Sequence, residues 1–139
     1  MRILVYYIGK ARDVHANGIA DEFVKRTSRY LACEMREIDP RRFDLFARHP
    51  SARKIFLDPG GRVMDSAQFT AIVADAERTA RDLVFLIGGA DGLPAEWKGR
   101  EDVLLSLSAM TFPHELARAM LAEQLYRAAT TMRGHPYPR

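Results

Sequence analysis

The sequence lacks several features that would place it in other classes of protein. It contains one cysteine, Cys33, so no disulfide can form within the chain, and the disulfide frameworks of small secreted proteins are excluded. No apolar run approaches the roughly 20 residues that span a bilayer, and the first residues, MRILVYYIGK, lack the long apolar region and cleavage site of a signal peptide. We therefore expect a cytoplasmic protein without a membrane partner.

The sequence also has few of the motifs that carry metal or nucleophilic chemistry. The four histidines, at positions 15, 49, 114 and 135, show neither the i, i+4 spacing of a helical metal pair nor a neighbouring pair of cysteines. No G-x-S-x-G turn is present to expose a nucleophilic serine. These absences predict that the protein holds no metal and that its chemistry, if any, does not use a serine or cysteine nucleophile.

The charge is only slightly positive, with 21 Lys and Arg against 18 Asp and Glu. Lysine occurs four times, so arginine supplies most of the positive charge, and its planar guanidinium suits phosphate and base recognition. The excess is compatible with an anionic partner, but solvated surface arginines would give the same composition.

The length of 139 residues, 47% of them hydrophobic, predicts one domain over residues 1–139. Short apolar runs predict strands at residues 3–8, 55–57, 83–87 and 103–107, with a weaker one at 35–38. Between them, helical periods predict a helix ending at Tyr30, a second that begins with a capping box of Asp65 and Gln68, and a third from about Pro113 to Met132. This alternation predicts an α/β fold with a mostly parallel sheet and flanking helices. Residues 43–48 form either a short helix or part of a mobile basic loop.

The last of these helices has apolar residues on two neighbouring stripes. One stripe has Ala117, Leu121, Leu125 and Ala128, and the other has Leu116, Ala119 and Met120. A single sheet face would not cover both stripes. The pattern therefore favours a homodimer, and the alternative is a helix that lies in the middle of its own core.

Three segments have the composition of ligand sites, although each also has a purely structural interpretation. Residues 86–92, LIGGADG, follow a predicted strand and form either a ligand loop or a tight turn. Residues 104–118 contain small polar groups that either face a ligand or cap the helix that follows. Residues 133–139, RGHPYPR, combine cationic groups with an aromatic ring, as in nucleic-acid contacts or a solvated basic tail.

Taken together in this order, the segments resemble the RlmH family, the small SPOUT-class methyltransferases of ribosomal RNA. The family patterns are Leu-Ile-Gly-Gly-x-acidic-Gly, here residues 86–92, Ser-Leu-Ser-Ala-x-Thr-x-Pro-His, here residues 106–114, and His-Pro-Tyr, here residues 135–137. The resemblance covers essentially the whole chain. It implies an α/β fold whose C-terminal helix forms a trefoil knot, and a homodimer that associates through the knot region.

The resemblance also implies a cofactor and a substrate. S-adenosylmethionine would lie in the knot, held mainly by backbone groups, and a side chain at position 89 would intrude on it. The implied cofactor residues are Leu57, Gly89, Leu107, Ser108, Ala109, Met110, Thr111, Phe112 and Pro113. The implied reaction methylates N3 of a pseudouridine in 23S rRNA of the ribosome.

For catalysis, the resemblance suggests proton handling by His114 and His135, base stacking by Tyr137, and contact of Arg139 and Arg133 with an imide oxygen or phosphate. His114 could equally hold the cofactor loop in place.

The chain departs from the family at Pro138, where a histidine is usual, at Ala90 and Asp91 in the glycine loop, and in a shortened region over residues 40–52. Two alternatives therefore remain open. One is a knotted RNA-binding protein that methylates a different nucleotide or has lost activity, and the other is a nucleotide-binding α/β module unrelated to RNA.

Overall fold

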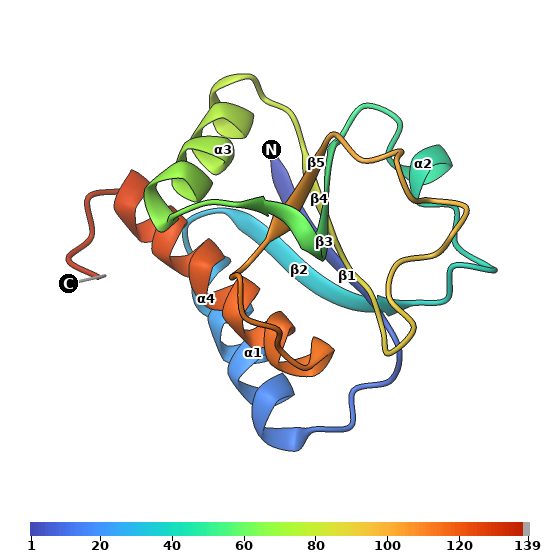
Figure 1. The fold of residues 1–139 in the computed structure, drawn as a ribbon. Helices are drawn as coiled ribbons and strands as arrows, with labels where there is room; N and C mark the ends of the chain where they lie inside the picture. Colours follow the sequence, from blue (N-terminus) through green and yellow to red (C-terminus); the bar gives the residue numbers. More distant parts are fainter. Residues whose placement is uncertain (138–139) are drawn as a thin grey trace.

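A five-stranded parallel sheet forms the centre of the computed structural model, which describes residues 1–137 (Figure 1). The strands lie in the order β2-β1-β4-β3-β5, and every pair is parallel. Along the chain the elements are β1 (Arg2–Ile8), α1 (Val14–Thr27), β2 (Ala32–Ile38), α2 (Leu45–Arg48), β3 (Arg53–Val63), α3 (Ser66–Arg78), β4 (Leu83–Ile87), β5 (Val103–Ser106) and α4 (His114–Met132). The predicted α/β fold with a mostly parallel sheet and flanking helices is confirmed.

The two faces of the sheet are covered by different parts of the chain. Helices α1, α3 and α4 lie on one side of the sheet, and α2 lies on the other (Figure 1). On the first side, Phe69 of α3 and Leu121 of α4 pack against strand residues such as Phe85. On the second side, Leu45 and Trp97 pack against inward residues of β1, β3 and β4. Strands covered on both faces are apolar throughout, which is why the all-buried β4 was predicted with its correct bounds.

Strand β3 is longer than the apolar run that predicted it. It continues to Val63 through a bulge, because Leu57 and Arg62 both pair with Leu105 of β5. The intervening sequence Asp-Pro-Gly-Gly is typical of a turn, so the prediction stopped at Leu57. Gly61 allows the return to the sheet, since a Cβ there would lie 2.7 Å from the backbone of Leu104.

The helix boundaries follow local capping signals. The capping box of Asp65 and Gln68 is present at the start of α3, as predicted. Helix α1 starts after Asp13, whose carboxylate accepts backbone N–H bonds from the first turn, and it ends at Thr27, before the predicted Tyr30. Asp44 caps the short helix α2, which decides the open choice over residues 43–48 in favour of a helix.

Helix α4 packs against both the sheet and α1, and this position buries Ala119 of its second apolar stripe. Ala119 and Ala122 pack against Ala20 of α1 within the same chain. The argument that this stripe requires a second subunit is therefore wrong for Ala119. Leu116 is 40% exposed, so part of the stripe remains uncovered.

Candidate functional site

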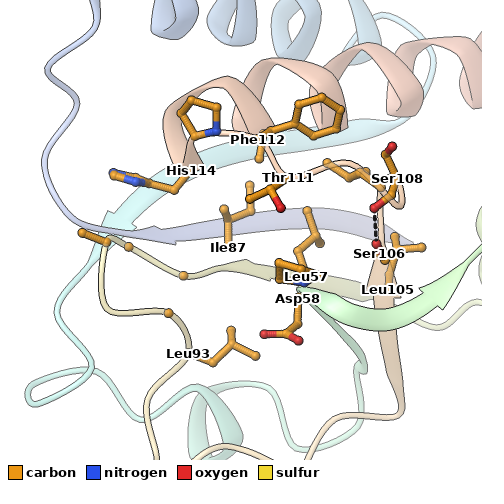
Figure 2. A pocket seen from close by; sticks show the side chains of 18 of the residues that line it. Leu57, Asp58, Ile87, Leu93, Leu105, Ser106, Ser108, Thr111, Phe112 and His114 are labelled. Atoms are coloured by element: carbon orange, nitrogen blue, oxygen red, sulfur yellow. Dashed lines mark hydrogen bonds between the residues drawn. The ribbon is translucent and has the colours of Figure 1, made fainter.

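A cavity of about 360 Å³ lies at the carboxyl ends of β3, β4 and β5 (Figure 2). Three connecting segments enclose it, namely the β3 bulge, the glycine loop after β4, and the segment from β5 into α4. Ligands of parallel α/β sheets bind at this edge, beyond the carboxyl ends of the strands. The lining residues are Leu57, Asp58, Pro59, Ile87, Gly88, Gly89, Ala90, Gly92, Leu93, Leu105, Ser106, Leu107, Ser108, Met110, Thr111, Phe112, Pro113, His114 and Ala117.

The cavity brings together eight of the nine residues that the sequence predicted to bind a cofactor. They come from three separate parts of the chain and are Leu57, Gly89, Leu107, Ser108, Met110, Thr111, Phe112 and Pro113. Ala109 belongs to the same loop but is not among the lining residues. Of the predicted catalytic residues, His114 lines the cavity as the first residue of α4.

The glycine loop has its shape because of contacts within the protein. A Cβ on Gly88 would lie 2.6 Å from the carbonyl carbon of Gly92, and a Cβ on Gly89 would lie 2.9 Å from the carbonyl oxygen of Ile8. Gly92 has a φ of +79° and donates its N–H to the Gly89 carbonyl over 2.9 Å. The backbone of β1 is therefore by itself a reason for a glycine at position 89, in addition to the expected space for a cofactor.

The loop between β5 and α4 is held by two serine side chains. The Ser106 hydroxyl donates to the Ser108 carbonyl over 2.7 Å, and the Ser108 hydroxyl accepts the Met110 N–H over 2.9 Å. These bonds fix the turn, as the structural interpretation of both serines expected. The loop therefore lines the cavity mostly with backbone and apolar groups.

Asp58 is a cavity residue that the sequence analysis missed. It directly follows Leu57, at the point where β3 leaves the sheet, and Figure 2 shows its carboxylate on the side of the cavity away from Phe112 and His114. Its Oδ2 accepts the N–H of Gly60 over 2.8 Å. An acidic residue immediately after the predicted strand of residues 55–57 was the signal that could have identified it.

A buried arginine, also missed, connects α4 to the loop beside the cavity. Arg118 is 0% exposed, and its guanidinium donates to the carbonyls of Ile8 and Gly9 and to Oδ1 of Asn17, over 3.2 to 3.3 Å. It also lies 3.8 Å from the centroid of the Tyr7 ring. Burial lowers the pKa of Arg118. The same Ile8 carbonyl contacts Gly89, so this arginine supports the wall of the cavity.

Glu115 completes this connection. Its carboxylate accepts the backbone N–H groups of Arg12 and Asp13 and the side-chain amide of Asn17, and it lies 3.6 Å from Arg118. These bonds, with the backbone N–H of Arg12 as the largest contribution, lower the pKa of Glu115 to about 2. The first turn of α4 is thereby fixed to the start of α1.

The described part of the C-terminal tail packs against α4. The Tyr137 hydroxyl donates to Oε2 of Glu123 over 2.5 Å, and its ring lies 4.8 Å from that of Tyr126. Burial and this carboxylate raise the pKa of Tyr137. The His135 Nδ1 accepts the N–H of Tyr137 over 3.1 Å. Arg133 forms an ion pair with Glu77 of α3 over 2.5 Å, so in this chain it has a structural partner.

Within one chain, residues 133–137 of the tail do not line the cavity. His114 begins α4 and His135 follows its end, and a helix of 19 residues is about 28 Å long. The structure therefore brings His114, but neither His135 nor Tyr137, to the predicted cofactor site. Arg139 lies outside the described residues.

The described residues offer few groups for metal binding or for thiol chemistry. Within residues 1–137, no set of three His, Cys, Asp or Glu side chains is placed to hold a metal ion. No helix among these residues is long and apolar enough to cross a membrane. Burial raises the pKa of the Cys33 thiol to about 12, which makes it a poor nucleophile at neutral pH.

Comparison with known proteins gives a family for the whole chain. The family described as "Predicted SPOUT methyltransferase" matches residues 1–138. The chain is 63% identical to the Ribosomal RNA large subunit methyltransferase H of Solibacter usitatus, over 100% of both sequences. It is 42% identical to the protein of the same name from Sorangium cellulosum, over 99% of both.

Solved structures with low sequence identity show the same fold. A probable methylase family protein from Haemophilus influenzae superposes with a TM-score of 0.63 at 9% identity, covering 99% of this chain and 70% of that one. An AdoMet-bound rRNA methyltransferase from Sinorhizobium meliloti gives 0.52 at 14% identity, covering 91% and 56%. The fold and the full-length match confirm the resemblance found in the sequence, and the chain belongs to the SPOUT methyltransferase family, with the ribosomal RNA large subunit methyltransferases H as its relatives.

Proposed function

We propose that this protein, as one domain over residues 1–139, transfers a methyl group from S-adenosylmethionine to N3 of a pseudouridine in 23S rRNA in the cytoplasm. The observation that carries the proposal is the cavity, where eight of the nine residues assigned to the cofactor by family resemblance line one space. The names of the full-length relatives support the large-subunit rRNA as substrate.

The cavity suits a nucleoside cofactor in size and chemistry. Its volume of about 360 Å³ lies in the range of small-molecule sites. Side chains such as Leu57, Ile87 and Leu105 would contact the adenosine, and the backbone of residues 107–113 would bond its polar edge. When bound, S-adenosylmethionine supplies a methyl group already activated by its attachment to a sulfonium.

The protein must align this methyl group with N3 and help to remove the N3 proton. The cavity residues would have to hold the cofactor so that its methyl carbon can pass to N3 while the electron pair of the carbon–sulfur bond stays with sulfur. His114, at the cavity, is our candidate to accept the N3 proton or to hold the cofactor loop. His135, Tyr137 and Arg139 are our candidates for orienting the base and stabilising its anion.

These two groups of residues would meet if a second chain takes part. Within one chain, His135 follows the end of α4, about 28 Å from the helix start at the cavity, and Tyr137 lies beside Glu123, about 14 Å from that start. In a two-fold dimer with antiparallel α4 helices, the tail of one chain lies near the cavity of the other. The exposed Leu116 supplies an apolar contact for this interface. We therefore include a homodimer with shared active sites in the proposal.

The trefoil knot that the resemblance implies is also part of the proposal. Its support is the path of the chain after the edge strand β5. Residues 107–113 run past the ends of β3 and β4 to reach α4, which packs against α1.

The test is methyl transfer from labelled S-adenosylmethionine to ribosomes from a strain that lacks the modification. Assembled ribosomes and isolated large subunits are compared, and mass spectrometry locates the methyl group. N3-methylpseudouridine supports the proposal. Methylation of another nucleotide, or none by a protein that still binds cofactor, supports the alternative of a knotted RNA-binding protein with a changed target or lost activity.

A further inference from the structure

Asp58 is the only carboxylate among the residues that line the cavity. The other titratable lining residue is His114, and the remaining lining side chains are apolar or neutral. Asp58 is partly buried, and none of the ion pairs formed within residues 1–137 involves it. Its negative charge therefore faces the cavity without a cationic partner from this part of the protein.

The β3 bulge holds this carboxylate in place. Because Leu57 and Arg62 share Leu105 as their pairing partner, residues 58–61 leave the sheet at the cavity. The N–H of Gly60 donates to Oδ2 of Asp58, and Gly61 returns the chain against the backbone of Leu104. A bulge commonly re-aims a side chain next to a functional site, and here the re-aimed side chain is Asp58.

We propose that Asp58 makes the cavity prefer the sulfonium cofactor over its thioether product. This rests on the proposed function, since it assumes that S-adenosylmethionine binds in this cavity. The cofactor and S-adenosylhomocysteine share their adenosine, ammonium and carboxylate groups and differ by one methyl group and one positive charge. A carboxylate in a largely apolar cavity attracts that extra charge more strongly than it would in water. The product, having lost the charge, then leaves more readily.

The expected preference is moderate because Asp58 is only partly buried. Water at the cavity mouth screens the interaction well below the low-dielectric limit. We expect the charge of Asp58 to supply about tenfold in affinity for the sulfonium form, which corresponds to about 1.4 kcal/mol.

The test is calorimetric titration of the full-length protein and Asp58→Asn with both ligands. Asparagine keeps a side-chain oxygen for the N–H of Gly60 and removes the charge. We expect the Kd for S-adenosylmethionine to rise about tenfold and the Kd for S-adenosylhomocysteine to change less than about twofold. Glu96→Gln is the matched control, since it removes an exposed carboxylate that does not line the cavity, and it should change neither Kd.

Equal weakening of both ligands would overturn the proposal, because Asp58 would then contact a group that they share. Unchanged affinity for both would overturn it as well. If Asp58→Asn does not fold, Asp58→Glu serves instead, since it keeps the charge and must keep the preference seen in the natural protein. A natural protein that binds neither ligand refutes the cofactor assignment itself, whereas a preserved charge preference without rRNA methylation refutes only the proposed substrate.

Discussion

Replacing Arg118 with methionine should destabilise the fold and loosen the cavity wall. The guanidinium has no contact with solvent and donates to three acceptors, the carbonyls of Ile8 and Gly9 and Oδ1 of Asn17. Methionine keeps the unbranched stem but lacks the guanidinium, whose carbon lies 3.8 Å from the centroid of the Tyr7 ring. The substitution therefore removes the hydrogen-bond donors and the cation–π contact together and leaves most of the packing of the stem.

The size of the destabilisation follows from the hydrogen-bond acceptors that lose their donor. A buried acceptor without a partner costs about 1 to 3 kcal/mol, and the three acceptors here are only partly buried, so each falls at the low end. Glu115 keeps its bonds to backbone N–H groups, so it is not left as an isolated charge. The summed loss is about 3 kcal/mol in the free energy of unfolding.

The assay is equilibrium unfolding in urea at a fixed protein concentration, since the stability of the proposed dimer would depend on concentration. Trp97, the only tryptophan in the sequence, is buried and reports unfolding by fluorescence. The control is Arg78→Met on α3, where the side chain is 73% exposed and pairs with Asp75, and its effect should stay below about 0.5 kcal/mol. A loss below about 1 kcal/mol for Arg118→Met would refute the reasoning.

Three further predictions follow from other parts of the structure. The folded-state pKa of Glu115 is lowered from 4.5 to about 2, so its stabilising effect is complete above about pH 4.5 and is lost as the pH falls toward 2. Glu115→Gln should therefore show a shallower loss of stability across this window in urea unfolding, and identical profiles would contradict the cited bonds. Gly89→Ala should destabilise the fold by about 1 to 3 kcal/mol, because the added Cβ would contact the Ile8 carbonyl. Gly18→Ala, in open space on α1, should stabilise the fold by up to about 1 kcal/mol, and both changes can be measured from the midpoints of urea unfolding. If active sites are shared between chains, His114→Ala and a chain that ends at Arg133 should each be inactive. Their co-expression should recover about a quarter of the methyl transfer of the natural protein, because half of the dimers are mixed and each mixed dimer has one complete site. No recovery would contradict active sites that are shared between chains, and an active truncated chain would place the tail outside the active site.

Local signals in the sequence predicted most of the elements. Five consecutive buried residues define β4, and the capping box of Asp65 and Gln68 defines the start of α3. Both signals depend on neighbours within a few residues, so they can be recognised without knowledge of the fold. Two of the three sequence motifs, residues 86–92 and 106–114, likewise predicted residues of the cavity, because each lies at the end of a strand.

The features that the sequence did not reveal depend on distant pairing. The extension of β3 beyond Leu57 exists because β5 pairs with both sides of the Asp-Pro-Gly-Gly bulge, and these residues alone resemble a turn. The same misinterpretation concealed Asp58. Arg118 is buried because its partners come from β1 and α1, about 100 residues earlier, and no local pattern distinguishes it from a surface arginine.

The sequence of α4 has more apolar residues than one face of a sheet can cover, and the structure gives the reason. Leu121 and Leu125 face the sheet, whereas Arg118, Ala119 and Ala122 face β1 and α1, so two of its sides are buried in the same chain.

A third side of α4 carries Glu123 and Arg127, and Glu123 holds Tyr137. This contact fixes the aromatic end of the tail beside the middle of the helix, nine residues after His114, which is about 14 Å along the helix axis from the first turn at the cavity. Glu115 holds the start of α4 to α1, and Arg133 holds its end to α3, so both the helix and the aromatic ring beside it have fixed places in the chain. From this place Tyr137 does not line the cavity of its own chain, and the proposed dimer therefore assigns it to the cavity of the other chain.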